Sequence, residues 1–181
     1  MRIGIDISQI VHEGTGVGRY VREMVKALLK EDKINEYILF GSSLRMRHIF
    51  FQYFDTVRSL NKTVRLVVIP LPPTILDYLW NRLHIVPVEW LIGNIDLFWS
   101  SDWTQPPLQR AKGVTTVHDL IALKYPNETD EKIVAVHKRR FAWVAKECQT
   151  IFCDSETTKE DVFTLLRIRP ERLRVMYPGV K

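Results

Sequence analysis

Short apolar segments recur along the chain, and five of them end in a cluster of small polar residues or glycines. Val114 to Val117 runs into His118-Asp119, much as Ile3 to Ile7 precedes the glycine-rich stretch 14–18. In an open parallel α/β sheet the ligand crevice lies outside the carboxyl ends of the strands, so residues that follow different strands share one edge. The sequence therefore predicts one extended ligand edge, formed by residues 14–18, 100–103, 118–119, 154–156 and 177–179.

The spacing of apolar residues changes repeatedly between the patterns of strands and helices. Strands are predicted at residues 2–7, 37–40, 64–69, 95–99, 114–117, 150–153 and 173–176. Helices are predicted at residues 17–30, 44–60, 76–83, 87–92, 128–146 and 155–166, the last capped by Ser155. The Pro-Leu-Pro-Pro stretch at 70–73 predicts a rigid connection, because proline lacks the amide donor of a helix interior. The alternation predicts an α/β fold with a Rossmann-like, doubly wound, mainly parallel sheet of about seven strands.

Length and charge narrow the class of protein further. The 181 residues fit one domain, and 26 Lys and Arg against 21 Asp and Glu give a net charge of +5. A solvated basic surface is favoured over nucleic-acid binding, since no nucleic-acid motif accompanies the charge. No apolar run approaches the roughly 20 residues that span a bilayer, and no signal peptide precedes the first strand. Two cysteines without C-x-x-C spacing, Cys148 at a helix end and Cys153 in a strand, predict a reduced, cytoplasmic protein without a metal site.

Residues 14–19, Gly-Thr-Gly-Val-Gly-Arg, lie between the first strand and the first helix. The dinucleotide fingerprint G-x-G-x-x-G has its third glycine one position later, where this chain has Arg19, so NAD binding is not expected. Two interpretations of the loop stay open. Free amides at the start of a helix bind a phosphate or sugar hydroxyls, with Arg19 adding charge. A tight turn that needs glycine dihedral angles explains the same residues.

His118 and Asp119 crowd the end of a buried strand, which favours a functional role over a structural one. A histidine at this place donates to a ligand hydroxyl or stabilises a developing charge. No serine or cysteine elbow accompanies it, which argues against a hydrolase triad. Ser101, Asp102 and Trp103 offer hydroxyl, carboxylate and aromatic groups suited to sugar recognition, although a capped turn with a packing tryptophan explains them equally well.

Five motifs follow one another along the chain: R-I-G-I-D at 2–6, G-T-G-V-G-R-Y at 14–20, T-V-H-D-L at 116–120, D-S-E-T-T-K-E-D at 154–161 and Y-P-G-V at 177–180. Their order and spacing resemble the N-terminal half of family-4-type glycosyltransferases of the GT-B fold, over essentially the whole chain. The resemblance implies that residues 1–181 form a single Rossmann-like, acceptor-binding domain. A C-terminal nucleotide-sugar domain with an E-x-x-x-x-x-x-x-E signature is absent from this sequence, and residues 177–181 resemble the segment that leads into it. The domain alone is therefore expected not to catalyse transfer.

The resemblance also implies substrates and residue roles. The complete enzyme is expected to be a retaining hexosyltransferase that needs no metal or other cofactor. It would transfer a sugar from a nucleotide-sugar to a saccharide or lipid-linked acceptor in cell-surface glycan synthesis. His118 is expected to contact the donor sugar near the reacting centre, with Asp119 supporting its loop. Contacts to donor or acceptor are expected for Gly14, Gly16, Val17, Gly18, Arg19 and Ser155.

Two further hypotheses concern the surface and the class of protein. Peripheral membrane contact would involve the basic residues Arg45, Arg47, Lys138, Arg139 and Arg140 with the aromatic Phe50, Phe51, Tyr53 and Phe54. A buried amphipathic helix is the favoured interpretation of this aromatic stretch. The competing class of protein is a non-catalytic α/β module that binds a glycan or a protein. An epimerase or dehydrogenase is disfavoured by the broken glycine fingerprint and the lack of a Tyr-x-x-x-Lys pair.

Overall fold

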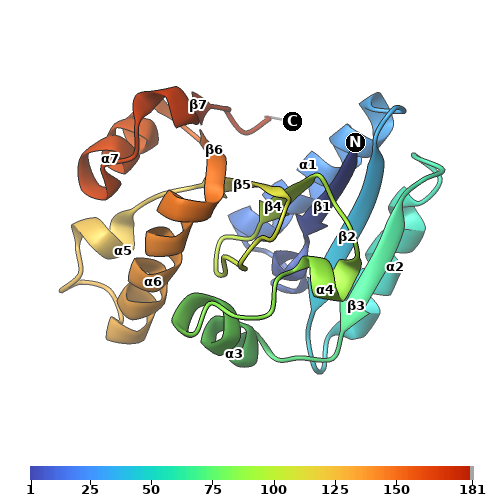
Figure 1. Ribbon diagram of the computed structural model, residues 1–181, viewed down its shortest axis with the longest axis horizontal. Coiled ribbons are helices and arrows are strands. Elements are labelled where there is room, and N and C mark those ends of the chain that lie inside the picture. Colours follow the sequence, from blue (N-terminus) through green and yellow to red (C-terminus); the bar gives the residue numbers. More distant parts are fainter. Residues whose placement is uncertain (180–181) are drawn as a thin grey trace.

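The computed structural model describes residues 1–179, which form a seven-stranded sheet with parallel pairing between all neighbouring strands (Figure 1). The strand order is β3-β2-β1-β4-β5-β6-β7. The strands are β1 (Arg2–Asp6), β2 (Glu36–Ser42), β3 (Arg65–Ile69), β4 (Leu97–Ser100), β5 (Lys112–Val117), β6 (Cys148–Cys153) and β7 (Leu173–Val175). The predicted Rossmann-like α/β fold is thus confirmed.

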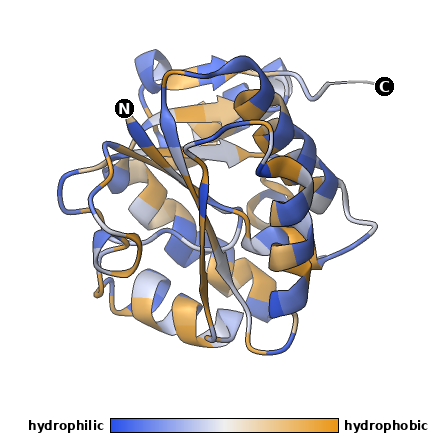
Figure 2. Cartoon of the chain, turned by 90° about the vertical axis from the view of Figure 1, so that its right-hand side faces the viewer, coloured by the Kyte–Doolittle hydropathy of each residue, from blue (hydrophilic) through white to orange (hydrophobic). Residues whose placement is uncertain are grey.

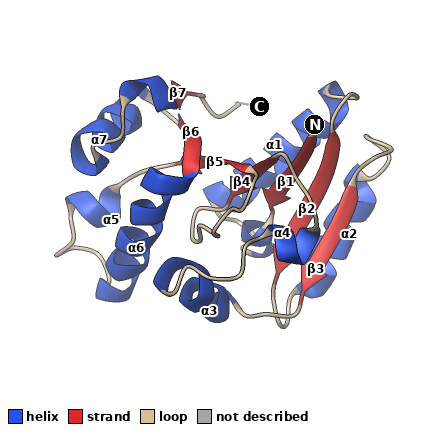
Figure 3. Ribbon diagram, in the orientation of Figure 1, coloured by secondary structure: helices blue, strands red, loops and turns tan. Residues whose placement is uncertain are grey.

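Helices connect the strands and flank the sheet (Figure 3). They are α1 (Gly16–Glu31), α2 (Arg47–Val57), α3 (Pro73–Leu76), α4 (Glu89–Ile92), α5 (Ile121–Lys124), α6 (Glu131–Glu147) and α7 (Glu156–Leu166). Three short elements of other helical types also occur: η1 (Ser8–Val11), η2 (Asp77–Arg82) and η3 (Pro170–Arg172). Of these elements, η1, α5 and η3 had no counterpart in the sequence prediction, because segments of three or four residues carry too little periodicity.

The sheet is buried on both faces, as expected for parallel strands covered by helices. Successive side chains of β2 point to opposite faces, so Leu39 and Phe40 lie in different core clusters. Leu39 packs with residues of α1 and α2, whereas Phe40 packs with Trp80 of η2 and Phe98 of β4. A third cluster joins β5, β6 and β7 to α6 and α7. In Figure 2 the helices on either side of the strands carry both hydrophobic and hydrophilic residues, the pattern of amphipathic covering helices.

The helix boundaries show where local signals were sufficient. Thr15 caps α1, since its hydroxyl accepts from the amide of Gly18 at 3.1 Å. The predicted helix 44–60 is shorter in the structure, and α2 buries Ile49, Phe50, Tyr53 and Val57 against the sheet. The buried amphipathic helix, the favoured interpretation of this stretch, is therefore confirmed.

One predicted helix was wrong in detail, and one predicted helix end was confirmed. The predicted helix 76–83 is replaced by the short α3, which begins at Pro73, followed by the π-helical turn η2. Proline fits the first turn of a helix because its missing amide would have no helical partner there. Cys148 lies at the end of a helix as predicted, since it is the C-cap of α6 and its amide donates to the carbonyl of Val144, and it is also the first residue of β6.

The central strand β1 marks a change of direction in the sheet. From β1 the chain adds β2 and β3 on one side, and it then returns to add β4 to β7 on the other side. Ile5 accordingly pairs with Leu39 of β2 on one side and with Trp99 of β4 on the other. In open α/β sheets such a switch point opens a crevice at the carboxyl ends of the strands.

Candidate functional site

A cavity of about 560 Å³ lies at the carboxyl ends of the strands around the switch point. We call it the strand-end cavity. The segments that follow β1, β3 and β4 contribute to its wall, while β2 contributes its last residue and α6 adds one residue. Its lining consists of Ser8, Gln9, His12, Ser42, Pro73, Thr74, Leu76, Asp77, Tyr78, Arg82, Ser101, Trp103, Thr104 and Val136. The mixture of apolar, aromatic and hydroxyl side chains is typical of a small-molecule site.

The turn after β4 supplies two of the predicted site residues to this cavity. Ser101 Oγ accepts from the amides of Trp103 and Thr104, both at 3.4 Å. The Trp103 ring packs 5.1 Å from the ring of His137 on α6. The capped turn with a packing tryptophan is therefore present, and the same turn places Ser101 and Trp103 on the cavity wall.

Asn81 in η2 fixes the opposite wall of the cavity to this turn. Its side chain is 2% exposed, and its amide nitrogen donates to the carbonyl of Trp103 and to Asp77 Oδ1, both at 2.9 Å. Its amide oxygen accepts from the backbone of Gln105 at 3.0 Å. π-Helical turns recur at functional sites. Sequence reasoning missed this wall, since the 73–82 segment carries no recognisable motif.

The charged side chains that line the strand-end cavity differ in whether they have an ion-pair partner. Asp77 forms an ion pair with Arg139 of α6, with 3.0 Å between Oδ2 and Nη2. Arg82, which is exposed at the cavity, pairs with no carboxylate among the described residues. The carboxylate of the wall is thus neutralised within the chain, whereas a cation stays open to a ligand.

A smaller cavity of about 20 Å³, the inner cavity, lies beside the strand-end cavity and shares Ser101 with it. Four predicted site residues meet there, two from the turn after β4, one from α1 and one after β5. They are Val17, Ser101, Asp102 and His118. The inner cavity has room for about one water molecule, so it is too small to be a binding site by itself. It could form only the innermost part of a site for a larger ligand.

Asp6 also lines the inner cavity, and sequence reasoning passed over it. Its side chain is 3% exposed, and its Oδ1 accepts from the amide of Ser8 at 2.8 Å. Its Oδ2 is buried and has no hydrogen-bond partner among the described residues. Burial raises the pKa of this carboxyl above its usual value, although the hydrogen bonds from Ser8 oppose the shift. Its position at the end of the R-I-G-I-D motif was the signal that could have found it.

His118 and Asp119 have different surroundings. The His118 ring faces Asp154, which follows β6, with 2.6 Å between Nδ1 and Oδ2. Asp119 Oδ1 instead accepts from the amide of Ile121 at 3.0 Å and so supports the start of α5. Asp154 lies in a predicted edge cluster but was not singled out. Because Val117 and Cys153 pair in the sheet, the residues after them become neighbours.

Asp102 is held by a buried cation beneath the site. Its Oδ1 lies 3.4 Å from Arg140 Nη1, and the fully buried Arg140 also donates to Thr115 Oγ1 at 2.8 Å. Burial lowers the pKa of the Arg140 guanidinium, and the charge of Asp102 opposes that shift. Asp102 is thereby presented to the inner cavity as a fixed carboxylate.

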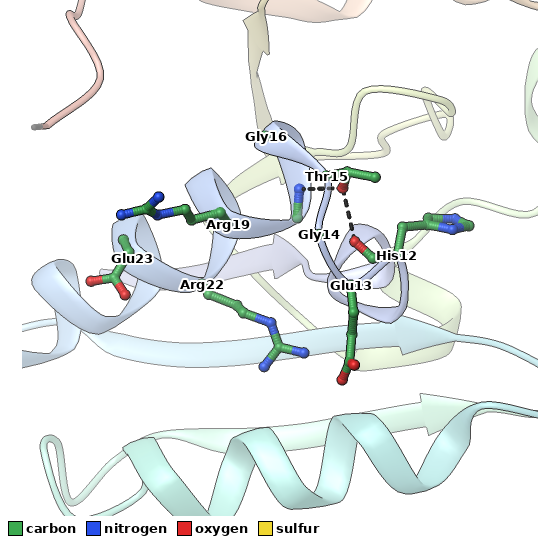
Figure 4. A pocket seen from close by; sticks show the side chains of 9 residues that line it. His12, Glu13, Gly14, Thr15, Gly16, Arg19, Arg22 and Glu23 are labelled. Carbon is green, nitrogen blue, oxygen red and sulfur yellow. Dashed lines mark hydrogen bonds between the residues drawn. The ribbon is translucent and has the colours of Figure 1, made fainter.

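The glycine loop forms a separate cavity of about 570 Å³ on α1, lined in part by Gly14, Gly16, Gly18 and Arg19 (Figure 4). Gly14 has φ +83°, a conformation that favours glycine. A side chain at Gly18 would lie 2.8 Å from the carbonyl oxygen of His12, so close packing requires glycine there. A side chain at Gly16 would meet open space, which leaves the start of α1 accessible.

The tight-turn interpretation therefore holds for two glycines of the loop, and the ligand-binding interpretation stays open for the third. Gly14 and Gly18 satisfy the tight-turn interpretation, whereas no contact within the described residues requires glycine at position 16. In Figure 4 the Arg19 side chain extends away from the loop.

Ser155 is the N-cap of α7, where its Oγ accepts from the amide of Thr158 at 3.1 Å. The predicted cap is thus confirmed.

The membrane-contact hypothesis was wrong for several of its residues. Arg140 is fully buried, and Phe50 and Tyr53 belong to the core. The helices that carry the two basic groups, α2 and α6, lie at opposite sides of the molecule in Figure 1, so their cations form no common patch. The sequence pattern misled because a buried arginine with an internal partner looks like a surface one. Among residues 1–179, no helix is long and apolar enough to cross a membrane.

The fold and the cavities define a class of protein: a Rossmann-like α/β domain with a ligand cavity at its switch point. The chain belongs to glycosyltransferase family 4, because the model of that family, Glycosyltransferase Family 4, matches residues 14–181. The predicted family is confirmed, and the chain is a glycosyltransferase-type domain, a class whose substrates are a sugar donor and an acceptor. A search of curated proteins finds no match to the chain. Within the described residues, no group of three or more His, Cys, Asp and Glu side chains is arranged to hold a metal ion.

Proposed function

We propose that this chain is the acceptor-side domain of a retaining glycosyltransferase. The observation that carries the proposal is the strand-end cavity at the switch point of a family-4 domain. Its wall combines aromatic Tyr78 and Trp103 with the hydroxyls of Ser8, Ser42 and Ser101. Aromatic faces bind the apolar faces of sugars, and hydroxyl groups bind sugar hydroxyls. The cavity therefore suits a saccharide acceptor.

The lining also supports an acceptor that carries an apolar or anionic group. Pro73, Leu76 and Val136 add apolar surface to the cavity, while Arg82 leaves one open cation at its edge. A lipid-linked sugar phosphate would match both features. The proposed setting is cytoplasmic assembly of cell-surface glycans, in which such acceptors are extended.

The donor is proposed to be a nucleotide-sugar held by a second domain that faces this edge. His118 would contact the donor sugar near the reacting centre, and the accessible start of α1 at Gly16 would approach the donor phosphate or the acceptor. Transfer with retention and without a metal or other cofactor follows from the resemblance to the family. Ser155 and Asp119 would keep their loops in place at the same edge.

A titration of the isotope-labelled chain, followed by NMR of backbone amides, tests this proposal. The probes are oligosaccharides, a short-chain prenyl diphosphate sugar, and the donors UDP-glucose, GDP-mannose and dTDP-rhamnose. We expect the acceptor probes to shift the amides of Ser101, Trp103 and Thr74 with weak affinity. The donors alone should produce only small shifts near Gly16. Trp103→Ala should reduce the acceptor shifts, and the matched exposed substitution Trp90→Ala should not.

The competing class gives a different result in the same titration. A non-catalytic glycan-binding module would bind a saccharide tightly, without any donor and with full affinity in this chain. Protein binding would leave all sugar probes without effect. Either outcome would contradict the acceptor-domain proposal.

A further inference from the structure

The His118 ring is held from several sides at the edge of the inner cavity. Asp154 Oδ2 lies 2.6 Å from Nδ1, and the Tyr20 ring meets the imidazole edge-on with centroids 4.8 Å apart. The backbone is fixed as well, since Thr158 Oγ1 donates to the carbonyl of His118 at 3.2 Å. These contacts come from α1, from the residue that follows β6 and from α7, so His118 is held by three segments other than β5, the strand that it follows.

The partner of Nδ1 decides where the proton of the neutral ring lies. An ionised carboxylate only accepts hydrogen bonds, so Nδ1 must carry the proton that it donates to Asp154. Nε2 is then the nitrogen with the free lone pair, and it has no hydrogen-bond partner among the described residues. An aspartate that orients a histidine in this manner selects the tautomer available to the substrate, as in hydrolase triads.

We propose that Asp154 is a positioning residue that fixes His118 in the Nδ1–H tautomer, so that Nε2 accepts a hydrogen bond from a hydroxyl group of the donor sugar. The proposal rests on the proposed function, which places the donor sugar at His118. No proton or group transfer is required for this role, because the hydroxyl donates to Nε2 and keeps its proton. Asp154 itself does not reach the ligand.

The surroundings of Asp154 support a role beyond holding the fold. Its Oδ1 is buried and lacks a hydrogen-bond partner among the described residues, so the carboxylate is not placed to satisfy a local turn. The adjacent Ser155 already caps α7. The charge of Asp154 also reaches the inner cavity: burial raises the pKa of Tyr20 to about 12, and Asp154 adds to this shift while the hydrogen bond to Thr116 opposes it. Tyr20 therefore stays protonated beside the histidine.

The tautomer is measured directly by NMR of the ¹⁵N-labelled imidazole rings of the whole chain, with His118→Ala to assign the signals. We expect the neutral His118 of the wild type to be protonated at Nδ1. In Asp154→Asn the protonated nitrogen should change to Nε2. The asparagine side chain has an NH2 group in place of one carboxylate oxygen, and this group donates to an unprotonated Nδ1. Asp154→Glu should restore the wild-type tautomer in part, and the exposed control Glu156→Gln should leave it unchanged.

Two results would overturn the proposal: a wild-type His118 protonated at Nε2, or an Asp154→Asn ring that keeps its proton on Nδ1. The wild-type spectrum decides the matter even where Asp154→Asn fails to fold. In the complete enzyme, with the donor-binding domain that the proposed function requires, sugar transfer from UDP-glucose, GDP-mannose or dTDP-rhamnose gives the second readout, with kcat reduced roughly 10- to 100-fold in Asp154→Asn and KM little changed. If His118→Ala leaves transfer unchanged, the proposed function of His118 fails, whereas the tautomer result stands by itself.

Discussion

Two buried ionisable side chains beneath the ligand edge differ in how their charge is compensated. Arg140 is paired with Asp102 and donates to Thr115, so its charge has partners on two elements. Asp6 has no cationic partner of this kind: one of its oxygens accepts from the Ser8 amide, and the other is buried without a geometric hydrogen bond among the described residues. A buried charge without compensation favours the neutral form. We therefore expect the protonation of Asp6 to make stability depend on pH.

Replacing Asp6 by asparagine should make the protein less sensitive to pH. Because burial raises the pKa of Asp6 in the folded state, the protonated side chain favours folding below the unfolded-state pKa. This contribution is lost as the pH rises through the folded-state pKa. The free energy of unfolding of Asp6→Asn, measured by urea denaturation, should rise relative to that of the wild type as the pH increases above about 4, the ordinary pKa of an aspartate. The exposed substitution Glu13→Gln is the control, and a constant difference between Asp6→Asn and wild type would contradict the prediction.

At the scale of elements, the start of α1 contains one closely packed position and one position that is open to a ligand. Gly18 lies where a side chain would collide with the carbonyl of His12, whereas Gly16 lies two residues earlier and faces open space. The η2 turn is fixed on the opposite side of the cavity. Asn81 binds it to the turn after β4 through buried hydrogen bonds. The elements around the strand-end cavity are thus fixed to one another, and the accessible positions lie between them.

Alanine substitutions at Gly16 and Gly18 should therefore have opposite effects. Gly18→Ala should lower the free energy of unfolding by roughly 1–3 kcal/mol, because the added methyl group overpacks the turn. Gly16→Ala should leave stability unchanged or raise it by up to about 1 kcal/mol, since alanine is the better helix former. It should nevertheless weaken the donor-induced amide shifts near the loop. Thermal unfolding and NMR titration of both variants measure the two effects, and full ligand response in Gly16→Ala would refute the access role.

For the whole molecule, the two cysteines report on the integrity of the sheet. Cys148 and Cys153 are the first and last residues of β6, and both are fully buried in the cluster that joins the sheet to α6 and α7. Burial raises the pKa of the Cys148 thiol to about 12 and that of the Cys153 thiol to about 11. Thiolate is the reactive form, so neither cysteine is available for chemistry in the folded protein.

Both thiols should consequently resist a thiol reagent until the protein unfolds. We expect the native chain to react with 5,5′-dithiobis(2-nitrobenzoate) at least about 100-fold more slowly than a free thiol at the same pH. Under increasing urea the two cysteines should become reactive together, at the midpoint of the circular dichroism transition. The control Ser59→Cys places a thiol on an exposed position and should react at once. Early reaction of one native cysteine would show that β6 opens separately from the rest of the sheet.

The amino-acid sequence determined the elements and the edge on which the site lies. Periodicity, caps and glycines are local properties, so the strands, the cap at Ser155 and the ligand edge after the strands could be predicted from them. The motifs were also sufficient for the family, which the match over residues 14–181 confirmed. The roles of His118, Asp119, Arg19 and the other site residues stay predictions, and residues 180–181 of the expected connecting segment lie outside the described part of the chain.

Only the tertiary structure decided which side chains meet. His118 and Asp154 are 36 positions apart, and they become partners because β5 and β6 are neighbours in register. Arg140 and Asp102 pair across a similar distance in sequence, 38 positions, which made a core residue look like a surface cation. The strand-end cavity exists because β4 lies beside β1 and not beside β3. Strand order depends on how all the elements pack together, and no local pattern contains that information.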